Sequence, residues 1–175
     1  MFKATSLICE IFDQRSVRYQ VIDTEKLSVV DAGYNIEGGP TVRVQFFSSN
    51  DENDVQIRLF GLMHKVPDGK RAALLEACNR VNREMRYYKF FLDKDGDLIG
   101  QGDVPAKISE GDIGECCFEM FIRAIQILTK CYHYFPEAMY GGAPEEKSET
   151  LLNALSALKD LRDHPITLPQ DQQEN

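Results

Sequence analysis

Two stretches of alternating residues decide the fold: Thr-Val-Arg-Val-Gln-Phe at positions 41–46 and Val-Gln-Ile-Arg-Leu at positions 55–59. Successive side chains of a strand point to opposite faces of a sheet, so each stretch predicts a strand with one apolar face. Polar residues 48–54 connect the two strands. Residues 27–34 predict a third strand, which ends before the Gly-Gly-Pro turn at positions 38–40. Antiparallel strands joined by short connections are therefore expected in this part of the chain.

Helical periodicity lies on either side of these strands. Apolar residues recur every three or four positions within 2–14, within 70–85 and, over a wider face, within 112–135. Two further strands, at 87–92 and 98–102, are expected to form a hairpin. The order helix, three strands, helix, two strands, helix predicts an α+β fold with a largely antiparallel sheet and helices packed on it.

A break at positions 141–144, Gly-Gly-Ala-Pro, divides the chain. Residues 1–142 are expected to form one α+β domain, and residues 143–175 an appended amphipathic helix, over 148–162, with a polar tail. The apolar face of the third helix is wider than packing on one surface requires, so we expect a second subunit to cover part of it. The predicted dimer or partner surface consists of Phe121, Ile125, Leu128, Tyr132, Leu151, Leu155 and Leu158.

The chain is acidic, with a formal net charge of −8 and an isoelectric point of about 4.9. Nucleic acid binding needs clustered Lys and Arg, and the densest basic stretch, residues 80–89, is interrupted by Glu84. An acidic surface also repels anionic lipids. Neither a nucleic acid nor a membrane surface is therefore expected as a partner.

The sequence predicts a cytoplasmic location. Residues 1–6 run directly into a helical pattern without the apolar core of a signal peptide. No apolar run approaches the ~18 residues of a membrane span. The five cysteines are odd in number and fall within predicted helices, a pattern typical of reduced thiols that pack as small hydrophobic groups.

Short motifs in the second half of the chain resemble those of a known family. Asn79 and Asn82 lie near the end of the second predicted helix, Lys89-Phe90 belongs to the aromatic strand that follows, and Asp95-Gly96 forms the next turn. This order resembles the YbjN family, whose members are described as bacterial sensory transduction regulators and share the fold of type III secretion chaperones. The resemblance covers roughly residues 1–140.

The resemblance implies the chaperone-like fold, dimerisation and a role in binding or regulating other proteins. It implies no catalytic residues that map onto this sequence. The helix appended after Pro144 departs from the family pattern, and this departure bears on which surface stays free for partners.

No metal site is expected. Residues 93–97, Asp-Lys-Asp-Gly-Asp, look like a calcium loop, which needs glycine at its sixth position and glutamate at its twelfth. Leu98 and Val104 occupy those positions, so a hairpin turn explains the stretch better. Cys117 and Cys131 are fourteen residues apart, about 21 Å along a continuous helix, which is too far to share a metal ion.

No enzyme or cofactor pattern is found either. His64, His133 and His164 lack the local spacing of a nucleophile–base pair, and the glycine pairs lack the Lys of a phosphate-binding loop. We therefore predict that the chain is not an enzyme and holds no cofactor. For Asn79 and Asn82, the favoured interpretation is that one faces inward and hydrogen-bonds the following strand; a ligand-binding role is the alternative.

Three hypotheses for function follow. The first is a homodimeric, protein-binding adaptor or chaperone-like regulator in bacterial signalling or stress response, with partner peptides on a sheet edge or in an apolar groove that the C-terminal helix covers until displaced. The second is a small-molecule sensor or enzyme with a site in an internal pocket. The third is a structural role in a larger assembly.

Overall fold

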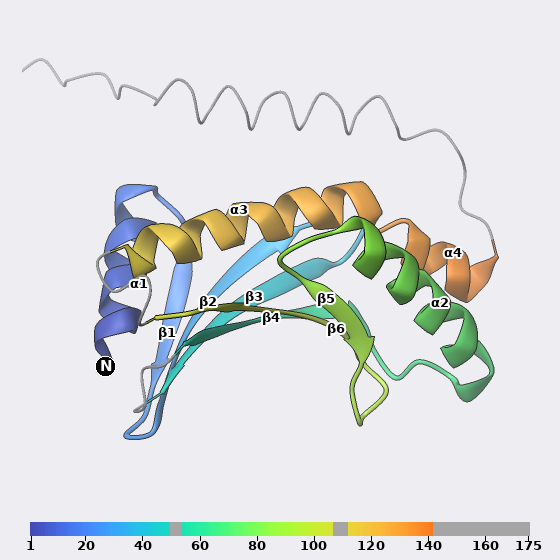
Figure 1. Ribbon diagram of the computed structural model, residues 1–175, viewed down its shortest axis with the longest axis horizontal. Coiled ribbons are helices and arrows are strands. Elements are labelled where there is room, and N and C mark those ends of the chain that lie inside the picture. The colour runs from blue at the N-terminus through green and yellow to red at the C-terminus, as the bar shows by residue number, and fades with distance from the viewer. Residues whose placement is uncertain (50–53, 107–111, 142–175) are drawn as a thin grey trace, which may run out of the picture. The chain divides into compact units, whose positions relative to one another are not determined.

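The computed structural model describes residues 1–49, 54–106 and 112–141, which all fall within one compact unit, Met1–Ala143. Figure 1 shows the arrangement of the elements. Their bounds are α1 (Lys3–Gln14), β1 (Tyr19–Asp23), β2 (Leu27–Asn35), β3 (Thr41–Ser49), β4 (Val55–Met63), α2 (Asp68–Glu84), β5 (Lys89–Leu92), β6 (Leu98–Val104), α3 (Ile113–Cys131) and α4 (Tyr134–Tyr140). The predicted α+β fold is confirmed, and the predicted elements follow one another in the predicted order, with β1 and α4 as additional elements.

The six strands form one sheet in the order β1-β2-β3-β4-β6-β5, and every neighbouring pair is antiparallel. The first four strands follow one another as hairpins. The chain then passes through α2 to the far edge, where β5 and β6 form the last hairpin and β6 pairs with β4. β1 and β5 are therefore the two edges of the sheet.

The core lies between the sheet and the helices. Val42, Val44 and Phe46 of β3 are fully buried, and the residues that alternate with them are half-buried or exposed, as the sequence predicts. Phe12 of α1 packs edge-on against Phe46, with their ring centroids 5.4 Å apart. In Figure 1, α3 runs along one face of the sheet, and α2 and α4 lie beside its β5–β6 end.

Close contact between α1 and α3 depends on a glycine. A Cβ atom at Gly114 would overlap the carbonyl oxygen of Leu7 in α1, so only a residue without a side chain allows the two helices to approach this closely. The contact places α1, and with it the start of β1, at a fixed position beside the sheet.

Two short elements were not predicted as separate units. The third helix was expected to run to 135 but ends at Cys131, and α4 begins at Tyr134. Pro136 has no N–H to bond the carbonyl of Tyr132, and its ring crowds that carbonyl, so a helix cannot run through this point unbroken. The sequence did not predict β1, because most of its residues face solvent and show no alternation of polar and apolar side chains.

Candidate functional site

The edge strand β1 leaves part of its backbone without a partner strand among the described residues. Thr24 N–H donates to the carbonyl of Leu27 at 2.9 Å, so these two residues are a hydrogen-bonded pair at the hairpin turn. Bonded and non-bonded pairs alternate along antiparallel strands. The backbone groups of Tyr19, Val21 and Asp23 therefore point away from β2, toward the open edge.

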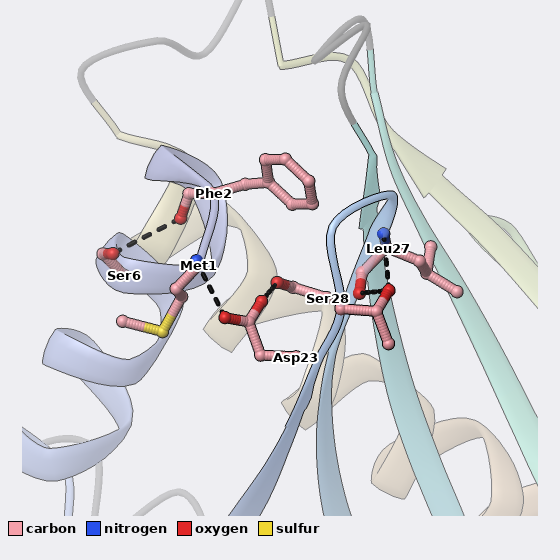
Figure 2. Close-up of polar contacts among 7 residues, drawn as sticks. Met1, Phe2, Ser6, Asp23, Leu27 and Ser28 are labelled. Carbon is pink, nitrogen blue, oxygen red and sulfur yellow. Dashed lines mark hydrogen bonds and ion pairs between the residues drawn. The ribbon is translucent and has the colours of Figure 1, made fainter.

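The turn end of β1 is fixed from the side of α1. The Asp23 carboxylate forms an ion pair with the Met1 ammonium at 2.8 Å and accepts a hydrogen bond from Ser28 Oγ (Figure 2). Hydrogen bonds from the Met1 ammonium and Ser28 lower the pKa of Asp23. The carboxylate is therefore charged at neutral pH and binds both the N-terminal residue and β2.

The other end of β1 is fixed by Tyr19. Its hydroxyl donates to Asp13 Oδ1 at 2.9 Å, and its ring packs edge-on against Phe12, with centroids 5.8 Å apart. Desolvation, and to a lesser degree the hydrogen bond to Asp13, raises the pKa of Tyr19, so the hydroxyl remains a donor at neutral pH. Tyr19 thus links β1 to the end of α1.

A buried carboxylate holds β1 from the opposite face of the sheet. Asp31 of β2 is only 5% exposed, and it accepts hydrogen bonds from Gln20 of β1 at 3.3 Å and Gln45 of β3 at 3.2 Å. Arg43 of β3 donates to both carboxylate oxygens, with its Nε 3.2 Å from Oδ1. Burying a charge is costly unless it is paired and hydrogen-bonded, and this network meets that cost while joining three strands.

Apolar side chains lie along this edge. Val21 is 38% exposed and Ile22 is 50% exposed, and the nearby Met1 and Leu27 are also exposed. Proteins normally shield an edge strand of this kind with charges, proline, bulges or a covering element. The β1 edge therefore combines open backbone groups with apolar contact surface on a strand that is held on both faces.

The opposite edge of the sheet is capped by a side chain. Asn82 of α2 donates from Nδ2 to the carbonyl of Phe90 at 2.9 Å and accepts from Phe90 N–H at 2.7 Å. Lys89 Nζ reaches the carbonyl oxygens of Asn82 and Met85. One amide group thus takes the place of a neighbouring strand, and the prediction that an asparagine of this helix bonds the following strand is confirmed for Asn82, whereas Asn79 is exposed.

Of the seven residues predicted as a dimer or partner surface, the structure describes four, and three of these lie in the core. Phe121, Ile125 and Leu128 are buried, and the Phe121 ring packs against Phe12. Tyr132 is half-buried beside Phe135. The predicted residues Leu151, Leu155 and Leu158, the helix over 148–162 and most of the 141–144 break lie outside the described residues.

Sequence reasoning did not identify the β1 edge. The available signal was the adjacent pair Val21-Ile22, set among polar residues just before a tight turn. Two neighbouring apolar side chains point to opposite faces of a strand, so one of them must face away from the core. The stretch gave no reason to place that strand at an edge, which depends on the pairing of the whole sheet.

The Asp-rich stretch 93–97 is the hairpin turn that its sequence predicts. Asp93 Oδ1 accepts hydrogen bonds from the backbone of Asp95 and Asp97, and Gly96 has a positive φ of 81°. Asp97 contacts His64 Nδ1 at 3.0 Å. Within the described residues, no group of three His, Cys, Asp or Glu side chains is placed to hold a metal ion.

The five cysteines are free thiols, and three of them are buried. Burial raises the pKa of Cys78 and Cys131 to about 11 and that of Cys117 still further. These thiols are protonated at neutral pH, and a protonated thiol is a poor nucleophile and metal ligand. Their packing agrees with the interpretation of small hydrophobic side chains.

A groove of about 610 Å³ separates α2 from α4. Arg80 lies over the ring of Tyr134, with its guanidinium carbon 3.9 Å from the ring centroid, and it donates to the Tyr134 hydroxyl at 3.0 Å. Glu76 and Glu137 also line the groove. Its lining is thus of mixed charge, and Arg80 is already engaged within it.

Comparison with known proteins places the chain in a family. The model of the YbjN family, described as "Putative bacterial sensory transduction regulator", matches residues 5–137. This range contains both sheet edges, the Asp31 network and Asn82. No curated protein matches the chain. No helix in the described part of the chain is long and apolar enough to cross a bilayer.

Proposed function

The chain belongs to the YbjN family, and on that premise we propose that it is a non-catalytic regulator that binds an extended segment of another protein along strand β1. The family description indicates a regulatory role, and the proposal specifies how that role is carried out, in bacterial signalling or stress response. The open backbone of Tyr19, Val21 and Asp23 is the observation on which the proposal rests.

An added strand would find both polar and apolar contacts at this edge. Each of the three outward-facing residues offers one N–H donor and one C=O acceptor. A typical hydrogen bond contributes a net ~1 kcal/mol, so the backbone alone gives a weak, sequence-tolerant interaction. Val21 faces the helical side of the sheet and Ile22 the opposite side, so apolar residues at alternate positions of the partner would provide selectivity.

A prepared edge favours this mode of binding. Side-chain contacts of Asp31, Tyr19 and Asp23 hold β1 on both faces of the sheet. Because the strand is already ordered, binding a partner costs little conformational entropy in β1. The raised pKa values of the buried thiols support the non-catalytic part of the proposal.

The test uses a synthetic library of unstructured peptides of about twelve residues, with binding followed by fluorescence polarisation. Val21→Pro removes one outward N–H at a position where an edge strand tolerates proline. Val21→Thr keeps that N–H and the strand preference, and is the matched control. Peptides selected by the native chain should bind Val21→Pro at least about ten-fold more weakly and Val21→Thr nearly as well.

Folding of both variants is checked by urea unfolding before any binding is compared. Equal binding by the native chain and Val21→Pro would place the peptide site elsewhere and refute the proposal. Failure of every peptide to bind the native chain at low protein concentration would also count against it.

A further inference from the structure

We propose that a second copy of this chain occupies the β1 edge when no partner segment is bound, so that self-association and partner binding exclude each other. The self-association stands on the geometry of β1 alone. The exclusion rests, in addition, on the proposed function, because it requires a partner that uses the same edge.

The outward-facing backbone groups are arranged symmetrically. Tyr19, Val21 and Asp23 point to the open edge, and Val21 is the middle residue of the five in β1. A two-fold axis normal to the sheet and passing beside Val21 would pair two β1 strands antiparallel. Val21 would then face Val21 of the second copy, and Tyr19 would face Asp23. In this register, the outward-facing N–H and C=O groups of one β1 strand lie directly opposite those of the other.

Side chains are compatible in that register. On the helical side of the sheet, two Val21 side chains meet at the axis, and the Tyr19 and Asp23 pairs on either side of them combine a hydroxyl with a carboxylate. On the opposite side, Gln20 faces Ile22. Like charges do not face each other across β1, and facing like charges are what destabilise cross-strand pairs.

Charge distribution favours this edge over the rest of the surface. Residues 1–24 contain three basic residues (Lys3, Arg15, Arg18) and three acidic ones (Glu10, Asp13, Asp23), so their formal charge is zero. The whole net charge of −8 therefore lies after residue 24. Two copies of an acidic protein repel one another least where their surfaces are neutral.

The other edge limits the assembly to a dimer. An open-ended chain of subunits would need β1 of one copy to pair with β5 of the next. Asn82 already bonds the outward N–H and C=O of Phe90 in β5, so head-to-tail pairing would have to displace this contact and is disfavoured. A single five-residue strand pair is a small interface, so dissociation in a range of roughly 1–100 μM is expected.

A charge-swap experiment on the full chain tests the position of the axis. Val21→Lys places two ammonium groups opposite each other in the dimer, and Val21→Glu places two carboxylates there. Each variant alone should be monomeric at a concentration where the native chain and the Val21→Thr control are dimeric. Mixed in equal amounts, the two variants should form a heterodimer, which native mass spectrometry identifies by its mass.

The exclusion is tested with a defined probe, an acetylated and amidated peptide of residues 17–25, with a scrambled peptide as control. It should dissociate the native dimer and protect the Val21 amide from exchange, whereas the scrambled peptide should do neither. In the wild-type chain, Val21 exchange should slow as protein concentration rises, a readout that needs no variant.

The possible results separate the two proposals. A native chain that stays monomeric, or variants that self-associate as well as the native chain, would overturn the self-pairing and leave the partner site of β1 intact. A dimer that binds the residue 17–25 peptide without dissociating would overturn the exclusion. If Val21→Lys is monomeric and library peptides bind neither it nor the native chain, self-pairing would stand and the proposed function would fail.

Discussion

The two edges of the sheet solve the same problem in opposite ways. Both β1 and β5 have backbone groups that point away from the sheet. At β5, Asn82 bonds both the N–H and the C=O of Phe90 and so caps the edge at its centre. At β1, the stabilising side chains act from the two faces and leave the edge itself open. Among the residues that the structure describes, a side chain thus caps the backbone at β5, whereas none does so at β1.

The difference shows that a strand can be held firmly in a sheet while its outer backbone groups remain available for binding. Asp31 and Arg43 hold β1 through the side chain of Gln20, so the strand stays in place although its outer backbone has no partner strand within residues 1–49, 54–106 and 112–141. At β5, by contrast, the Asn82 contact that attaches the strand to α2 is also the contact that caps its edge. A mutation in α2 should therefore disturb both functions at β5, whereas the two can be altered independently at β1.

The largest expected difference between the edges is in amide exchange. The Phe90 amide is bonded to Asn82 in a part-buried position, so it should exchange only when the hairpin opens. The Val21 amide should exchange almost as in an unfolded peptide, about 1000-fold faster than that of Phe90. Residue-level exchange at low protein concentration measures both. Similar rates at the two positions would contradict the contrast between a closed and an open edge.

The next largest effect should follow from opening the closed edge. Asn82→Ala leaves the N–H and C=O of Phe90 without their partner, which should lower the free energy of unfolding by about 2–3 kcal/mol. Urea unfolding measures this loss.

Asn79→Ala is the matched control, since Asn79 lies one turn earlier on the exposed side of α2. It should change the unfolding free energy by no more than about 0.5 kcal/mol. Equal losses in the two variants would mean that the asparagines act through helix stability, and that Asn82 has no special role at the edge.

The closed edge was largely predictable from the sequence, because its determinants are local. Asn82 and Phe90 are eight residues apart, and the hairpin that follows is signalled by Asp95-Gly96. When a short aromatic strand closely follows a helix with an asparagine near its end, few hydrogen-bonding partners other than the backbone of that strand lie within reach of the amide. The prediction that one asparagine bonds that strand needed no knowledge of the rest of the sheet.

The open edge could not be predicted, because it depends on long-range pairing. The network on Asp31 joins residues from three strands, and alternation alone does not show which aspartate is buried. The apolar stripe of α3 posed a similar difficulty. Phe121 and Leu128 have the same spacing in sequence whether they cover the sheet of one chain or contact a second chain, and the structure places them in the core.

A smaller effect is expected when the support of β1 is weakened. Arg43→Ala removes the charged partner of the buried Asp31 carboxylate, but Arg43 is itself half exposed, so water will replace part of the interaction. A loss of about 1–2 kcal/mol in unfolding free energy is expected. The amides of Gln20 and Ile22 should exchange faster, whereas that of Phe90 should be unchanged.

Arg58→Ala is a useful comparison for that variant, because Arg58 lies on the same face, on the next strand, where it stacks over Phe47. Its removal should leave the exchange of Gln20 and Ile22 as in the native chain. If both arginine variants loosen β1 equally, the effect belongs to the face as a whole and not to the Asp31 network.

The smallest expected effect distinguishes the two edges by pH. The Met1 ammonium and Ser28 lower the pKa of Asp23, so this carboxylate stabilises the folded chain above its unfolded pKa, about 3.9. That contribution is lost as the pH falls through the lower, folded pKa. The amide of Asn82 does not titrate, so acidification should loosen the turn end of β1 before it affects the cap on β5.

Titration of the Asp23 carboxyl carbon by NMR measures the pKa directly, and Ser28→Ala should raise it toward the ordinary range. An Asp23 that titrates like an unstructured aspartate would show that the ion pair with Met1 does not hold this end of β1 in solution.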